Sequence, residues 1–316
     1  MSRCVVFSMF ALIAVSIVTF TFPPLLRAQG APFEPKGDKI QQDKWNNIPP
    51  PRSAYAGKKS AAAPPRDISG IWDAAGAGLQ ANGAFEHPAI LPGGQGAEGG
   101  RPDETGIEHP LPYTPLGLET LKANKPSGPG VRQVPSTLAN DPADHCDPLG
   151  FPYMELWGLR TIEVVQTPNQ VLILIPYYGN YRVIWTDGRP FPKDPDPRWN
   201  GYSVGKWVDD YTFVVDTVGL NPKSWIDHAG RPHSQDLRVE ERFHRVDHDN
   251  LELTLTIIDP KMYTQPWQAL NKFPLHLMGP DFDIQQLLCS PSEMNSYNKD
   301  IGDVVVPEEQ KQEEKK

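Results

Sequence analysis

The chain has 316 residues, of which 39% are hydrophobic and 22% charged, so it can bury one sizeable core without requiring two large domains. Its formal net charge is -9, and its basic residues do not cluster into a stripe, which argues against a nucleic-acid partner. We therefore predict a single folded domain that does not bind nucleic acid.

The first thirty residues are typical of a secretory signal peptide. Arg3 precedes an apolar run, Cys4 to Phe22, and a small-residue cleavage region follows near Gly30. Because the run approaches the roughly 20 residues that span a bilayer, an uncleaved N-terminal membrane anchor with a periplasmic domain is the alternative. Two prolines directly after the apolar run favour cleavage. We predict a secreted or periplasmic protein with no stable membrane insertion after the signal is removed.

Composition divides the rest of the chain into three parts. Residues 31–66 are rich in Pro and Ala without an apolar period, which indicates a disordered linker. Residues 67–290 are predicted to form one β domain, whose loop region, 74–156, is rich in Gly and Pro. Residues 291–316 form a charged tail that we expect to be disordered.

One short helix is expected inside the loop region. Thr114 can cap it, Pro115 suits the first helical position, and the sequence "LGLETLKA" follows.

After residue 156 the apolar residues recur with period two, which is typical of strands. In "LELTLTII", Leu251, Leu253, Leu255 and Ile257 share one face, so the sheet should have one buried and one solvated face and be antiparallel. Eight strands joined mostly by hairpins favour a mainly β, up-and-down meander. We predict an eight-stranded lipocalin-like barrel with long Pro/Gly-rich loops; a β-sandwich is the alternative. The expected strands contain, in order, "GIWD", "TIEVVQ", "VLILIPYY", "YRVIWTD", "YSVGKW", "YTFVVDT", "LRVEERFHRV" and "LELTLTII".

Two cysteines remain after the signal segment, Cys146 and Cys289. In an exported chain such a pair favours a disulfide, and the alternative is two separate buried thiols. We expect their Cα atoms to lie within about 7 Å.

Several phrases, taken in order, resemble a family of uncharacterised exported bacterial proteins: "DISGIW", "YTP", "CDPLGFP", "EVVQTP", "DGRPFP", "SVGKW", "VVDT", "GRPHS", "ERF" and "YTQPW". The resemblance covers about residues 67–289 and implies no particular activity. Many relatives have His before "SVG", where this chain has Tyr202, which argues against a catalytic role for that position. The sequence "GIW" is also similar to the Gly-x-Trp opening of lipocalins.

The segment "SWIDHAGRPHS" and the strand after it supply the candidate catalytic residues. His233 has an ordinary pKa suited to proton transfer, and Glu241 or Asp227 could be its acid–base partner. Alternation places Glu241 on the apolar face of its strand, where a carboxylate must be paired, protonated or functional. The alternative is an internal ion pair with Arg182 or Arg245 that performs no chemistry.

Metal binding by the same loop is a weaker hypothesis. Asp227, His228 and His233 could meet one zinc ion, but no His-x-x-x-His or Cys-x-x-Cys spacing fixes such a geometry. We predict no metal site. No phosphate loop, dinucleotide fingerprint or haem-attachment motif occurs, so we predict no cofactor.

Aromatic residues are frequent in the strand region, where most should pack in the core. A few at the barrel mouth could form a pocket for a flat or apolar ligand; the candidates are Trp185, Trp207, Trp225, Tyr263 and Trp267. The first functional hypothesis is therefore an exported protein that binds a small apolar or aromatic molecule. A hydrolase or lyase using His233 with Glu241 or Asp227 is the second, and a structural or surface-interaction protein the third. The sequence does not decide whether the protein is an enzyme or what its oligomeric state is.

Overall fold

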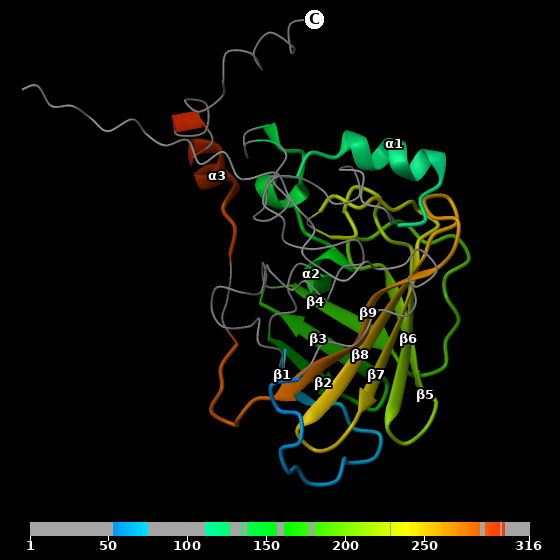
Figure 1. Cartoon of the computed structure of the whole chain (residues 1–316), viewed down its shortest axis with the longest axis vertical. Helices are drawn as coiled ribbons and strands as arrows, with labels where there is room; N and C mark the ends of the chain where they lie inside the picture. Colours follow the sequence, from blue (N-terminus) through cyan, green and yellow to red (C-terminus); the bar gives the residue numbers. More distant parts are fainter. Residues whose placement is uncertain are drawn as a thin grey trace, which may run out of the picture. The chain divides into compact units, whose positions relative to one another are not determined.

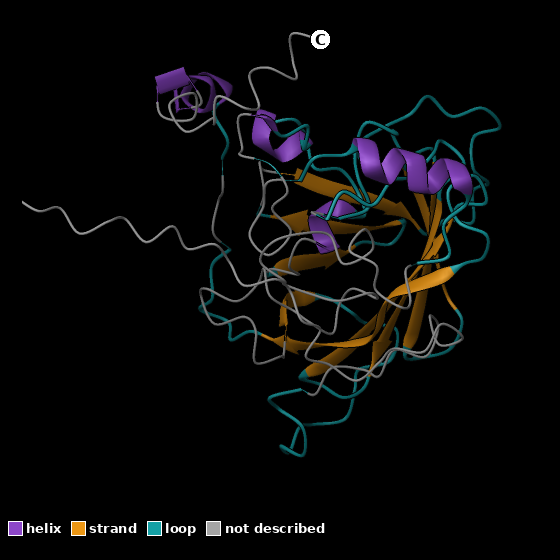
Figure 2. Ribbon diagram, turned by 45° about the horizontal axis from the view of Figure 1, so that its top comes forward, coloured by secondary structure: helices purple, strands orange, loops and turns teal. Residues whose placement is uncertain are grey.

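The computed structural model describes residues 53–74, 111–126, 134, 138–156, 161–176, 180–227, 229–284, 288–297 and 299–300. Within them, nine strands form one closed barrel in chain order (Figures 1 and 2). The predicted mainly β fold and barrel are thus confirmed, with one more strand than expected. The strands are β1 (Gly70–Ala74), β2 (Ile162–Gln166), β3 (Gln170–Ile175), β4 (Asn180–Trp185), β5 (Tyr202–Trp207), β6 (Thr212–Val218), β7 (Arg238–Arg245), β8 (Asn250–Ile258) and β9 (Trp267–Leu277).

The strand that the sequence pattern missed is β9, which closes the barrel by pairing with both β8 and β1. Its sequence, "WQALNKFPLHL", contains Pro274, a residue that argues against a strand because it cannot donate to the ladder. The register with β8 also shifts, and Lys272 in this strand has a positive φ of 46°. Such an irregular strand does not keep the period-two pattern.

The number of strands has a consequence for their directions. Nine strands in a closed ring cannot alternate direction all the way round, so at least one neighbouring pair must be parallel. That pair is β4 and β5, which departs from the predicted antiparallel meander. The registered pairs between them are Ile184 with Ser203 and Trp185 with Val204, whereas the β5–β6 hairpin pairs along all of β5. The chain reaches the parallel position through the long connection between Trp185 and Tyr202.

The barrel interior is filled with large side chains. The face predicted from alternation in β8 is buried, and all four of its apolar residues are fully inaccessible. In β7 the prediction also holds, because Val239, Glu241 and Phe243 are all 0% exposed. The interior is completed by Trp72, Val164, Ile173, Ile184, Phe213, Val215, Trp267 and Phe273.

Short helices lie near the end of the barrel marked by α2 in Figure 1: α1 (Pro115–Ala123), the 3-10 turn η3 (Pro142–His145) and α2 (Tyr153–Leu156). The predicted α1 is confirmed, since the Thr114 hydroxyl accepts from the amide of Gly117 at 3.0 Å. Gly117 packs directly on the backbone of Met262, where a Cβ atom would collide. Within α1, Leu121 is buried whereas Leu116 is half exposed.

Part of the predicted linker contacts the barrel. Ser53–Arg66 crosses the opposite end, where the Arg66 amide donates to the Asp210 carbonyl at 2.6 Å and the His248 amide donates to the Ala61 carbonyl at 3.0 Å. The Tyr55 ring stacks on His276 with centroids 3.4 Å apart. The rest of the linker, the signal segment and the end of the charged tail lie outside the described residues, as does most of the predicted loop region. Among the residues that are described, no helix is long and apolar enough to cross a membrane.

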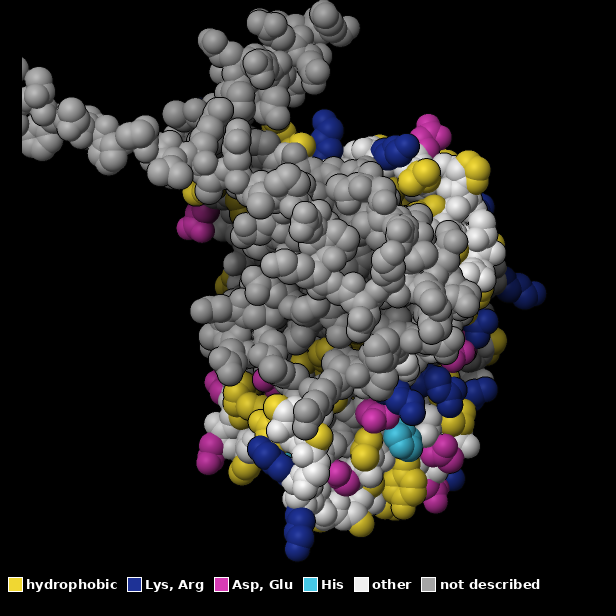
Figure 3. Space-filling view, viewed as in Figure 1, with side chains coloured by type: hydrophobic (Ala, Val, Ile, Leu, Met, Phe, Trp, Pro, Cys, Tyr) yellow, Lys and Arg dark blue, Asp and Glu magenta, His cyan; other side chains and the backbone are white. Residues whose placement is uncertain are grey.

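Charged side chains of both signs are interspersed on the visible described surface (Figure 3). Among the described residues visible on this face, no large patch of a single sign is apparent.

The predicted disulfide is present. Cys146 and Cys289 are bonded, with Cα atoms 5.5 Å apart. Cys146 follows η3, and Cys289 precedes α3 (Pro291–Tyr297), a helix with no buried residues that contacts η3. The bond therefore fastens a C-terminal arm beside the short helices.

Replacing both cysteines with serine is expected to release this arm and to leave the barrel folded. A long closed loop would stabilise the protein by about 4–5 kcal/mol in the entropic model, but the folded arm also gains freedom here, so we expect a loss below that value. Hydrogen exchange should accelerate in residues 291–297 and remain slow in β7 and β8. Equal acceleration in the arm and the barrel strands would contradict this expectation.

Candidate functional site

A buried ionic cluster occupies the barrel interior. The Arg182 guanidinium of β4 donates to both carboxylate oxygens of Glu241, at 3.0 and 2.6 Å, and to Oε1 of Glu155 at 2.5 Å. It also lies 3.6 Å from the ring centroid of Phe151. Of the two partners proposed for Glu241 from the sequence, Arg182 is the one found. Glu155, which α2 carries into the interior, was not anticipated.

Glu155 has an unusual protonation equilibrium. Burial and the neighbouring charge of Glu241 raise its pKa to about 8, against the opposing effect of Arg182. At neutral pH Glu155 is therefore mainly protonated, and the cluster is close to neutral, with one guanidinium and one carboxylate. Glu155 Oε2 and Arg182 Nε are buried without a hydrogen-bond partner in the described part of the chain.

Asp227 and His233 lie outside the barrel strands, in the loop between β6 and β7. Asp227 forms a buried ion pair with Arg231 at 2.8 Å. His233 Nε2 lies 2.9 Å from Ser224 Oγ, and Nδ1 lies 3.0 Å from the Ser234 carbonyl. Burial lowers the pKa of His233, so its ring is neutral at physiological pH.

The loop is held to the rest of the domain by further buried contacts. Asp259 accepts from the Ser234 amide at 2.6 Å and from its hydroxyl at 2.9 Å, and the Tyr263 hydroxyl donates to the Pro232 carbonyl at 2.9 Å. Among these described contacts, no hydrogen bond joins His233 to Glu241 or to Asp227. His228 lies outside the described residues, and elsewhere no group of three potential metal ligands occurs within them.

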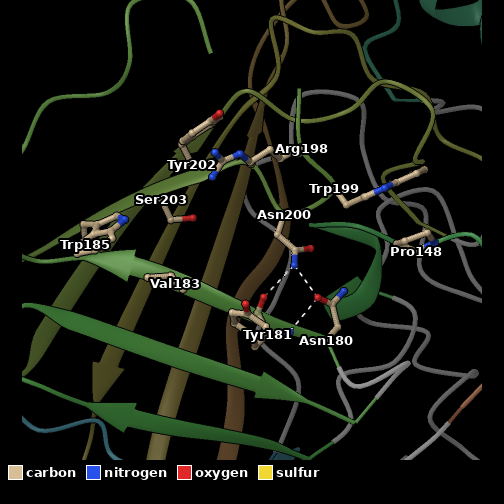
Figure 4. A pocket seen from close by; sticks show the side chains of 11 residues that line it. Pro148, Asn180, Tyr181, Val183, Trp185, Arg198, Trp199, Asn200, Tyr202 and Ser203 are labelled. Atoms are coloured by element: carbon tan, nitrogen blue, oxygen red, sulfur yellow. Dashed lines mark hydrogen bonds between the residues drawn. The ribbon is translucent and has the colours of Figure 1, made fainter. Parts of the chain in front are cut away.

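A pocket of about 480 Å³ lies where β4 and β5 run parallel (Figure 4). It runs along β4 from its first residue to its last and is bounded on the other side by the start of β5 and the residues that lead into β5. Its lining consists of Pro148, Asn180, Tyr181, Val183, Trp185, Arg198, Trp199, Asn200, Gly201, Tyr202 and Ser203.

A second pocket of about 290 Å³ adjoins the first. The two share Trp185, Arg198, Tyr202 and Ser203, and we call them together the β4–β5 cleft. Pro190, Phe191 and Pro192, from the connection between the strands, complete its apolar wall. The cleft follows from the sparse pairing of β4 with β5, which leaves room that a full hairpin ladder would close.

Planar groups are frequent in the wall of the cleft. The Arg198 guanidinium lies 4.1 Å from the centroid of the Tyr202 ring, beside which Figure 4 shows it, and the Arg189 guanidinium lies 3.4 Å from that of Trp185. Such stacking holds these flat side chains in place along the wall of the cleft.

One polar atom of the cleft lacks a partner. Asn200 Nδ2 donates to Asn180 Oδ1 at 2.7 Å and to the Tyr181 carbonyl at 3.0 Å, as Figure 4 shows. These two acceptors fix the orientation of the amide. Asn200 Oδ1 is then left buried with no donor among the described residues. An unsatisfied buried acceptor is costly, typically about 1–3 kcal/mol, and a ligand donor could relieve that cost.

Of the five aromatic residues predicted to bind ligand, Trp185 lines both pockets. Trp207 packs against Phe213, with centroids 5.2 Å apart. Trp225 stacks with Tyr153, and Tyr263 packs edge-on against the fully buried Trp267. Sequence reasoning missed Tyr202, Arg198 and Asn200, whose common signal is their position in and just after the long β4–β5 connection.

In comparisons with known proteins, no family model, no curated protein and no solved structure matches the chain.

Proposed function

We propose that the protein is exported and binds a small organic molecule with a planar, partly apolar ring system in the β4–β5 cleft. The observation that carries this proposal is the pair of adjoining pockets that share Trp185 and Tyr202. Ligand sites are typically apolar concavities with a few placed polar groups, and the orphaned Asn200 oxygen is such a group. The disulfide supports a location outside the cytoplasm, because such bonds persist in oxidising compartments.

The proposed binding site is the β4–β5 cleft, whereas a lipocalin-like protein would be expected to bind its ligand inside the barrel. The interior is filled by core side chains and the Arg182 cluster, whereas the cleft opens in the barrel wall. The acid–base alternative receives less support, since Glu241 is bound by Arg182 and Asp227 by Arg231.

Removal of an aromatic ring from the cleft should weaken binding. Tyr181 is 60% exposed and lines the larger pocket, so Tyr181→Ala should reduce affinity several-fold with little effect on folding. The matched control is Tyr211→Ala, because Tyr211 is also exposed (43%) but is absent from the lining of either pocket.

The measurement is a screen of neutral and charged indole, naphthalene and phenol compounds by saturation-transfer NMR. Amide shifts in labelled protein would then map the site, and they should fall in β4, β5 and the residues between them. Ring compounds that shift other regions of the protein, with equal affinity for the two tyrosine variants, would exclude the cleft as the site.

A further inference from the structure

Ser203 connects the cleft to the buried ionic cluster. It belongs to β5, lines both pockets and is only 2% exposed. Behind it, Ser203 Oγ lies 2.8 Å from Thr217 Oγ1 of β6, and Arg182 Nη2 donates to that same Thr217 oxygen at 3.3 Å. A chain of polar groups therefore runs from the buried guanidinium to the wall of the cleft.

The Arg182 guanidinium sets the direction of each hydrogen bond in this series of polar groups. A guanidinium can only donate, so Thr217 Oγ1 accepts from Arg182. Thr217 is fully buried, and within the described residues its hydroxyl has one other neighbour, Ser203, to which it can donate. If Thr217 accepted from both, its own proton would be buried without a partner, which is costly. Ser203 thus accepts from Thr217, and its own hydroxyl proton is free to donate into the cleft.

Arg198 supplies a second donor to the same space. The neighbouring Arg189 is neutralised by Asp187, with Nη2 and Oδ2 2.6 Å apart. Arg198 also lines both pockets, and no ion pair to it is found within the described chain, although Asp194 and Asp196 belong to the same connection. Its charge is therefore left for a ligand, while the Tyr202 ring holds its guanidinium in place.

We propose that the ligand carries an oxyanion, a carboxylate or a phosphate, bound between the Ser203 hydroxyl and the Arg198 guanidinium, with its ring against Trp185 or Tyr202. Ser203 ends a chain of hydrogen bonds that begins at a guanidinium, and Arg198 is itself a cation. Both favour a negatively charged acceptor, because hydrogen bonds to ionised groups are stronger than those between neutral groups. This inference rests on the proposed binding function and adds the chemical class of the ligand.

The test compares two probes of nearly equal shape, indole-3-acetate and indole-3-acetamide, by isothermal titration calorimetry on the intact protein. The acetate should bind at least about tenfold more tightly than the amide. A parallel pair, phenyl phosphate and phenol, distinguishes the two sources of the oxyanion: the larger preference over the neutral partner identifies carboxylate or phosphate as the group that fits.

Three variants locate the effect. Arg198→Ala and Ser203→Ala should each reduce the preference for the anionic probe several-fold, measured in each variant as the ratio of the dissociation constants of the neutral and the anionic probe. Arg242→Ala also removes one positive charge, from an arginine 46% exposed on β7 that lines neither pocket, and should leave the preference intact. Because Arg198 is exposed, its variant should fold even if the buried Ser203 variant does not.

The outcomes separate the two proposals. If the neutral probes bind in the cleft and neither anion binds more tightly, the oxyanion inference is overturned and the binding function stands. If Arg242→Ala lowers the preference as much as Arg198→Ala, the effect is general electrostatics and the inference also fails. If neither member of either pair binds in the cleft, the proposed function is lost together with the inference.

Discussion

Arg182→Ala is expected to destabilise the barrel by about 3–5 kcal/mol, the usual cost of removing one partner from a buried ion pair. The substitution would leave Glu241 at 0% exposure without a cation and would remove the group that Glu155 and Thr217 contact. Desolvation of the remaining carboxylate, more than the lost attraction, accounts for the size of the effect. Urea unfolding followed by tryptophan fluorescence measures it.

Two further variants control the interpretation. Arg242→Ala, on the outer face of β7, should change the free energy of unfolding by less than about 0.5 kcal/mol. The double variant Arg182→Met with Glu241→Leu should recover much of the loss, because an apolar pair of similar volume avoids the buried charge. A single Arg182→Ala variant as stable as the parent would show that the cluster does not stabilise the fold.

The second large effect is a dependence of stability on pH that Glu155 imposes. Its pKa rises from an ordinary 4.5 to about 8 on folding. The contribution of Glu155 to the free energy of unfolding is fully present below pH 4.5. It is lost as the pH rises through 8, because Glu155 releases its proton at a lower pH in the unfolded chain than in the folded protein. The free energy of unfolding should therefore fall across this range by up to about 1.4 kcal/mol per pH unit from this group.

Glu155→Gln is the matching variant, because Gln can still accept from Arg182 but does not ionise. The parent should lose stability relative to Glu155→Gln as the pH rises from 5 to 8. Taking the difference between the two proteins removes the contributions of other groups, including Asp141, whose pKa burial raises to about 7, and His233, whose shift has the opposite sign. Parallel stability curves for the two proteins would show that Glu155 is not protonated in the folded state.

The sequence pattern was informative wherever a strand is regular and one of its faces is buried. Alternation located β7 and β8 and placed Glu241 inside, and the cysteine pair was correctly joined. Alternation failed to identify β9, because a proline and a bulge interrupt the period of two in that strand. That single omission also concealed the parallel pair, since eight strands can alternate around a ring and nine cannot.

The cleft was harder to anticipate because its residues share no local pattern. Trp185 was selected for its aromatic ring, but Ser203 and Arg198 are ordinary residue types whose importance depends on where the β4–β5 connection places them. Glu155 was missed for a related reason: it lies in a one-turn helix beyond the strand region, where no periodicity indicates that its side chain enters the barrel.

The odd number of strands also bears on how this protein could change over evolutionary time. Any closed ring of nine strands must contain parallel neighbours, and the opening lies at such a pair, β4 and β5. The sparse pairing of these two strands leaves the room, and backbone pairing does not require a particular side chain at position 198 or 202. Substitutions at Arg198 or Tyr202 could therefore exchange one ligand for another while the opening itself persists. The position of the binding site could then be conserved among descendants of this protein while its ligand specificity changes.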